Sequence, residues 1–347
     1  MRHTNVRSRA PLRLGFGGGG SDLSPYCDEH GGVVLSGTID RYAFAHVTAR
    51  DDDKLVFRAH DLGQEEELAA SVDIDIRAGL GLHRAVYRHM MREYNGGVAA
   101  PLTITTTIDV PAGSGLGASS ALTVGLIEAF VVAMELPLGP YDVARLAFDI
   151  ERRQLGLAGG KQDQYAAAFG GLNFIEFLPG SENVVVNPLR MKREFLNEFE
   201  SSLVICFSGQ SRRSAEIIEQ QVAGLSALDE QTIAAMHELK QHAVTMKMQL
   251  LSGDVRGMAD VLKSSWLSKK RTASSVSNST VERLMDVAMN AGAWAGKVSG
   301  AGGGGFIMLL TDPEQRYGLI RQLNEAGGSA SAAKLTFEGA EAWAVPS

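Results

Sequence analysis

The chain has 347 residues, enough for two domains that each bury a hydrophobic core. Its hydrophobic content of 45% and charged content of 21% are typical of a globular protein, and a net charge of −7 argues against a general nucleic-acid-binding protein. Residues 1–9 are polar and basic, and no apolar run approaches the roughly 20 residues of a membrane span. With only two cysteines, Cys27 and Cys206, we expect a cytoplasmic protein without a membrane or nucleic-acid partner.

The first predicted strand, residues 9–16, runs into a loop that contains four consecutive glycines. The loop reads Gly17-Gly18-Gly19-Gly20-Ser21-Asp22. Glycine lets the backbone approach another group closely, which favours a binding role. Asp22 could accept hydrogen bonds from ligand hydroxyls, or it could form an Asx-turn or a cap. After this loop we expect a pair of strands, residues 33–39 and 42–49, and then a helix over residues 79–94.

A second glycine loop separates a strand rich in Thr and Ile, residues 101–110, from an apolar helix, residues 122–134. Backbone N–H groups and the dipole at a helix N-terminus favour a bound anion, so this arrangement predicts a phosphate site. An ordinary turn with a serine N-cap is the alternative. The loop has no Gly-Lys pair followed by Ser or Thr, and no second strand ending in an acid follows, so Walker and dinucleotide-binding loops are both disfavoured. Its residues are Gly113, Ser114, Gly115, Leu116, Gly117, Ala118, Ser119 and Ser120.

Two acids follow this loop within residues 140–171. A helix over residues 141–151 ends at Glu151, and a second helix begins near Asp163. Taken alone, Asp163 would complement the dipole of its own helix. Because a phosphate loop, a second acid and the base Lys161 accompany it, we predict that Asp163 receives or polarises the proton of a substrate hydroxyl.

The second half of the chain contains a third glycine loop. A strand over residues 172–177 is followed by an exposed linker or hairpin, where we place a boundary between domains 1–180 and 181–347. A strand over residues 203–207, a helix over residues 228–251 and a helix that begins with a capping box at Ser279 come next. Residues 299–305 are mostly glycine and lead directly into a buried strand, which favours binding over a linker.

Together these features predict phosphoryl transfer. Three glycine loops imply a ligand with several negative charges that is held largely by backbone. The hydroxyls of Ser119 and Ser120 and the carboxylate of Glu151 are hard oxygen ligands of the kind that Mg²⁺ prefers. An anion cradle, a metal and an acid beside an alcohol are the parts that a kinase needs.

The sequence also resembles the GHMP kinases, over essentially its whole length. The matching motifs are residues 10–13 with residues 21–22, residues 111–121, and residues 297–304. The resemblance implies an α+β fold, with an N-terminal domain like domain 2 of ribosomal protein S5 and a ferredoxin-like α/β C-terminal domain. The active site would lie between the two domains, and ATP and Mg²⁺ would be the cofactors.

The resemblance also implies roles for individual residues. Asp163 is the expected catalytic acid residue, and Arg13 would neutralise the charge that develops during transfer. Glu151 would hold Mg²⁺ with Ser119 or Ser120, while residues 113–120 surround the ATP phosphates. Asp22 matches the position that binds sugar hydroxyls in galactokinase-like members. Galactokinases have a Gly-Glu-His-Thr-Asp run where this chain reads Gly18-Gly19-Gly20-Ser21-Asp22, which argues against galactose.

Within the family, residues 13–22, 208–212 and 266–271 are most similar to the sugar kinases of nucleotide-heptose synthesis. This implies transfer of the γ-phosphoryl group to the anomeric O1 of D-glycero-D-manno-heptose 7-phosphate, on the way to capsule or lipopolysaccharide. A fucokinase-like or other GHMP kinase is the alternative, followed by a non-catalytic sugar or nucleotide sensor. A homodimer is a candidate assembly. Lys269 and Arg271 are further candidate cations for the substrate phosphate, and the expected substrate-binding residues are Gly19, Gly20, Ser21, Asp22, Lys161, Arg212, Lys270, Gly302 and Gly303.

Overall fold

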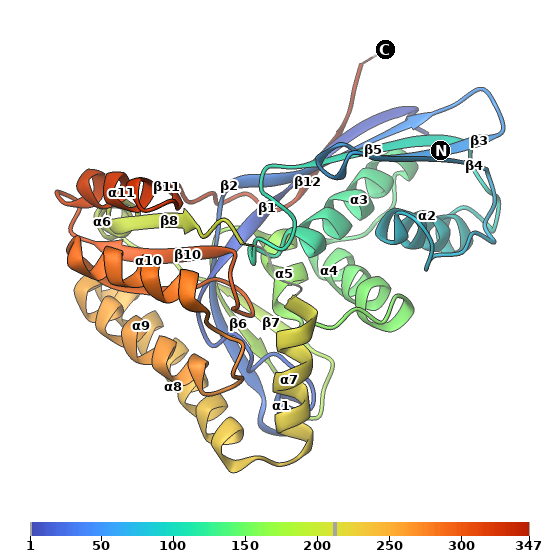
Figure 1. Cartoon of the computed structure of the whole chain (residues 1–347). Coiled ribbons are helices and arrows are strands. Elements are labelled where there is room, and N and C mark those ends of the chain that lie inside the picture. Colours follow the sequence, from blue (N-terminus) through green and yellow to red (C-terminus); the bar gives the residue numbers. More distant parts are fainter. Residues whose placement is uncertain (1, 211–213, 347) are drawn as a thin grey trace.

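The computed structural model describes residues 2–210 and 214–346, which form two β-sheets with helices packed against them (Figure 1). The larger sheet has the order β12-β1-β2-β5-β3-β4, and β6 and β7 extend it from β2. Its strands are β1 (Asn5–Gly17), β2 (Gly32–Ala49), β3 (Lys54–Ala59), β4 (Gln64–Ala69), β5 (Leu102–Ile108), β6 (Leu172–Phe177), β7 (Val184–Pro188) and β12 (Glu341–Ala344).

The smaller sheet is antiparallel and has the order β11-β8-β10-β9. Its strands are β8 (Leu203–Phe207), β9 (Ala293–Val298), β10 (Phe306–Thr311) and β11 (Ser329–Ala332). The helices are α1 (Tyr26–His30), α2 (Gly81–Tyr94), α3 (Ala118–Met134), α4 (Pro140–Phe148), α5 (Gln162–Phe169), α6 (Arg193–Ser202), α7 (Ser214–Ser226), α8 (Glu230–Ser252), α9 (Val255–Lys270), α10 (Ser279–Asn290) and α11 (Arg316–Glu325). None of the helices described is both long enough and apolar enough to cross a membrane.

The prediction of two separate strands in residues 33–49 is wrong, because β2 is one continuous strand of 18 residues. Its first part pairs with β6 and its second part with β5. Pro11 pairs with Tyr42 and Leu12 with Ile39, so Asp40 and Arg41 are extra residues that bulge from the ladder with β1. A bulge bends a strand without ending it, and β2 therefore joins β6 and β7 to the rest of the larger sheet.

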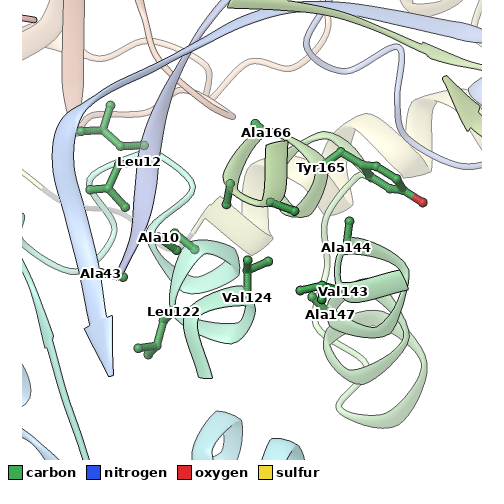
Figure 2. Packing of buried hydrophobic residues seen from close by; sticks show 14 of the residues in the cluster. Ala10, Leu12, Ala43, Leu122, Val124, Val143, Ala144, Ala147, Tyr165 and Ala166 are labelled. Carbon is green, nitrogen blue, oxygen red and sulfur yellow. The ribbon is translucent and has the colours of Figure 1, made fainter. Parts of the chain in front are cut away.

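Helix α3 lies at the centre of the hydrophobic core. Most of its side chains are buried, as expected for a helix that is apolar on all faces. Figure 2 shows Ala10 and Leu12 of β1 on one side of α3, and Val143 and Ala147 of α4 on the other. The phosphate loop predicted at the N-terminus of α3 is therefore attached to a firmly packed helix.

Strands of the larger sheet lie on both sides of residue 180 in the sequence. β7, which follows that residue, pairs with β6, and β12 returns to pair with β1. The boundary between domains 1–180 and 181–347 stays a prediction. The N-cap of α10 also differs from expectation: Asn278, one residue before Ser279, accepts a hydrogen bond from Val281 N at 2.9 Å.

Candidate active site

The predicted phosphate loop lines a cavity of about 290 Å³ together with the loop before α1. Residues from α7, α9 and the third glycine loop complete its walls. The predicted site residues among its lining are Arg13, Gly19, Gly20, Asp22, Gly113, Ser114, Gly115, Gly117, Ala118, Ser119, Ser120 and Asp163. These predicted residues therefore lie around one cavity, although they come from β1, from the start of α3 and from α5.

The second and third glycine loops pack directly against each other. Phe306 N donates to Ser114 O at 2.9 Å, which fixes the end of the third loop to the second. Gly115 has a φ of +76°, and a Cβ at this position would lie 2.6 Å from Ser299 O. Leu116 differs from its neighbours because its side chain is buried in the core, and its carbonyl accepts from Arg13 N at 3.0 Å. Leu116 therefore shapes the loop without lining the cavity.

We expect Gly115→Ala to destabilise the protein by more than about 2 kcal/mol, because it adds a steric clash to a left-handed conformation. Gly156→Ala is the matched control: Gly156 also has a positive φ, +69°, but a Cβ there would meet nothing within 4 Å. The control should lose only about 1 kcal/mol from the backbone conformation. Urea unfolding of both variants measures the difference, and equal losses would contradict close packing of the two loops.

Arg13 and Asp163 form an ion pair in the lining of the cavity. Arg13 Nη2 lies 2.6 Å from Asp163 Oδ1, and Arg13 Nε donates to the same oxygen at 2.8 Å. Arg13 Nη1 also donates to Gly115 O at 2.7 Å. The arginine is almost fully buried, whereas the side chain of Asp163 is 22% exposed. The guanidinium thus orients the carboxylate and leaves it accessible from the cavity.

Glu151 lies in a π-helical segment, Asp149–Gln154, that continues α4, and its side chain is fully buried. Its carboxylate accepts hydrogen bonds from Ser120 Oγ at 2.7 Å, from Ser119 Oγ at 3.1 Å and from Thr123 Oγ1 at 3.3 Å. Gln164 Nε2 donates to the same carboxylate. Thr123 and Gln164 are not among the residues predicted from the sequence, although Thr123 follows Ser119 by one helical turn and Gln164 is adjacent to Asp163.

Asp22 is also held in place by its neighbours. Its Oδ1 accepts from Gly20 N and from Gln162 Nε2, both at 3.0 Å, and its Oδ2 accepts from Gln162 N at 3.1 Å. Ser21 instead supports the loop, because its hydroxyl donates to Val33 O at 2.9 Å and it does not line the cavity. In the predicted sugar-binding loop, Ser21 therefore makes a structural contact, whereas Asp22 lines the cavity.

Two buried lysines connect the first glycine loop to the second half of the chain. Lys269 Nζ on α9 donates to Gly19 O at 3.0 Å, and Lys297 Nζ on β9 donates to Gly15 O at 2.9 Å. Burial lowers the pKa of Lys269 to about 8, although Asp22 partly opposes the shift. Burial, together with repulsion by Lys269 and Arg13, lowers the pKa of Lys297 to about 7.

We expect Lys297 to make the stability of the protein increase with pH above neutrality. Below about pH 7 this lysine is charged in both states, and from there to its usual value of 10.5 only the unfolded chain binds the proton. The free energy of unfolding should therefore rise by up to about 1.4 kcal/mol per pH unit relative to Lys297→Met. Urea unfolding of both proteins between pH 6.5 and 9 measures this difference, and a constant difference would contradict the prediction.

Other predicted substrate residues lie outside this cavity. Lys161 Nζ is 3.2 Å from Asp28 Oδ1 and lines two neighbouring cavities instead. Lys270 Nζ is 3.3 Å from Glu282 Oε1, and Lys270 does not line the cavity that its neighbour Lys269 lines. Gly303 N donates to Val276 O, and its carbonyl accepts from Asn278, so it holds the third loop. The adjacent Gly302 packs closely on Val276, because a Cβ at Gly302 would lie 2.6 Å from Val276 O. Arg212 lies outside the described residues.

Comparison with known proteins assigns the chain to a family. It matches the GHMP kinases N terminal domain over residues 81–171 and the GHMP kinases C terminal domain over residues 246–329. The D-glycero-alpha-D-manno-heptose 7-phosphate kinase of Campylobacter jejuni is 40% identical over 342 residues, which cover 98% of this chain and 99% of that protein. The chain belongs to the GHMP kinase family.

A solved structure and a second relative extend the comparison. The crystal structure of a D-glycero-D-manno-heptose 1-phosphate kinase from Bacteriodes thetaiotaomicron has a TM-score of 0.84 and 40% identity, covering 99% of this chain and 100% of that one. The bifunctional fucokinase/GDP-fucose pyrophosphorylase of Arabidopsis thaliana is 26% identical over 92% of this chain but 31% of its own length. As a family member, this chain is an ATP-dependent phosphotransferase with an alcohol group as acceptor. The predicted family, α+β fold and reaction class are confirmed.

Proposed function

We propose that the chain transfers the γ-phosphoryl group of ATP to the anomeric O1 of D-glycero-D-manno-heptose 7-phosphate. The observation that carries this proposal is the position of Asp163 and Asp22, which line one cavity with the glycine loop at the N-terminus of α3. The choice of sugar rests on the relative from Campylobacter jejuni, which is 40% identical along almost the whole chain. The product would be the heptose 1,7-bisphosphate.

In this proposal the carboxylate of Asp163 accepts the proton of the anomeric hydroxyl as the oxygen attacks the γ-phosphorus. The new O–P bond forms while the bond between the γ-phosphorus and the β–γ bridging oxygen breaks, and ADP leaves with the electron pair. Arg13 holds the carboxylate in place through the ion pair and adds positive charge beside the transferring group. Backbone N–H groups of the loop at the start of α3 bind the phosphate oxygens.

The residues present also fit a magnesium ion. No group of three or more His, Cys, Asp or Glu side chains in the described ranges could hold a metal ion by itself. Mg²⁺ is usually bound by one or two carboxylates with waters and substrate phosphates. Ser119 and Ser120 line the cavity, and Glu151, which is buried behind them, accepts hydrogen bonds from both, so these three residues would supply the protein ligands. The ion would neutralise charge on the ATP phosphates. Glu151, in turn, is oriented by the hydroxyls and by Gln164, which prevents its side chain from rotating away.

ADP release across a panel of acceptors tests this proposal. The panel holds heptose 7-phosphate, the same heptose without phosphate, fucose, mannose, galactose and mevalonate, each with ATP and Mg²⁺. Phosphorus NMR should reveal a new anomeric phosphate with heptose 7-phosphate. Turnover of fucose in its place would favour the fucokinase-like alternative, and sugar binding without ADP release would favour a sensor. Light scattering of the same preparation tests the predicted homodimer.

A further inference from the structure

Lys269 is a buried cation whose binding capacity is largely unused. Its side chain is almost fully buried, yet it forms part of the cavity wall. The ammonium group has three donors, and in the described part of the chain it makes one hydrogen bond, to Gly19 O, and no ion pair. Burial of an ammonium without a contacting carboxylate is unfavourable by several kcal/mol. Such a position suggests that an anionic ligand group completes the site.

The other cations that line the cavity already have carboxylate partners. Arg13 contacts Asp163, and Arg152 Nη2 lies 3.7 Å from Glu151 Oε2. Asp22 attracts Lys269 but its oxygens are engaged by Gly20 and Gln162. Among the described residues that form this cavity, Lys269 is thus the cation best able to bind an additional negative charge.

We propose that Lys269 binds the phosphate group that the sugar already carries before the reaction. This inference rests on the proposed function and deepens it, because it gives the substrate an orientation. The phosphate lies against α9 and the Gly19–Gly20 backbone, Asp22 binds hydroxyls between, and the reacting hydroxyl lies at Asp163. A charge-assisted bond to a phosphate dianion offsets the desolvation of the ammonium. The neighbouring Lys270, which pairs with Glu282, is excluded from this role.

Replacing Lys269 with methionine tests the inference, because methionine retains the length of the side chain and removes the charge. We expect KM for heptose 7-phosphate to rise by about 10–100-fold, the usual range for loss of a hydrogen bond to a charged group. KM for ATP should change less than about threefold. With the heptose that lacks the phosphate, kcat/KM of the variant should fall much less than with heptose 7-phosphate, because only the hydrogen bond to Gly19 O is then lost. Lys263→Met, the same change at an exposed position of α9, is the matched control.

Three other outcomes would contradict either this inference or the proposed function. An unchanged KM for heptose 7-phosphate would overturn the role of Lys269 while leaving the proposed function intact. A raised KM for ATP alone would also overturn it and assign the lysine to the nucleotide. Failure of the wild type to phosphorylate heptose 7-phosphate would instead refute the proposed function. Thermal melting with ATP verifies folding, and Lys269→Gln replaces the methionine variant if that variant is unfolded.

Discussion

Asp163→Asn should lower kcat by about 10²–10⁴-fold and leave the affinity for ATP nearly unchanged. Asparagine retains the shape of the side chain but cannot accept the proton of the acceptor hydroxyl, and general-base catalysis contributes rate factors of this size. We expect other groups to hold the nucleotide, since the predicted phosphate loop lies at the start of α3 and Asp163 lies on α5. Steady-state rates and calorimetric titration with a non-hydrolysable ATP analogue measure the two quantities.

Asp163→Asn would also remove the charged partner of Arg13. Arg13 also donates to Gly115 O at 2.7 Å and to Ser299 Oγ at 3.3 Å, so we expect it to keep its position. A melting temperature close to that of the wild type would show that the loss of rate is chemical. Wild-type turnover by Asp163→Asn would refute the catalytic role of this residue.

Glu151→Gln should produce the second large effect, through Mg²⁺. Glutamine has one oxygen acceptor where Glu151 offers two, and it carries no charge, so the apparent Mg²⁺ affinity should fall by roughly 10–100-fold or more. The rate at saturating ATP should then depend on Mg²⁺ at concentrations where the wild type is already saturated. Binding of ATP measured by calorimetry with and without Mg²⁺ tests the same residue independently of turnover.

Asp149→Asn is the matched control for Glu151. Asp149 lies in the same π-helical segment, but its Oδ1 is 3.1 Å from Arg153 Nη1 and it makes no hydrogen bond with Ser119 or Ser120 among those described. Its replacement should leave the Mg²⁺ dependence unchanged. If both variants alter that dependence equally, the effect comes from the helical segment and not from the carboxylate of Glu151.

Much of the site could be predicted because its parts are local in sequence. The loop before α3 is recognisable from its alternating glycines and the apolar helix that follows, and the structure places it on the cavity as expected. Strand β1 and its glycine loop were predicted by the same kind of local pattern, although β1 extends four residues further towards the N-terminus than expected, from Asn5.

Features that depend on contacts between residues distant in the sequence could not be predicted from local patterns. The sequence does not distinguish Lys161, Lys269 and Lys270, because all three carry the same charge. In the structure Lys161 contacts Asp28, Lys270 contacts Glu282, and Lys269 is buried. Likewise, the apolar runs on either side of Asp40 look like two strands. Only pairing with both β5 and β6 shows that β2 is continuous.

Strand β12 has a consequence for how the chain folds as it is synthesised. Residues 341–344 pair with β1 on the side opposite to β2, yet they follow every other described element in the sequence. Until they leave the ribosome, the outer edge of β1 has unpaired backbone N–H and C=O groups, which can associate with another nascent chain. The strand that carries Arg13 is thus completed last. Synthesis of residues 341–344, and not of the first half of the chain, would be the step that completes the larger sheet.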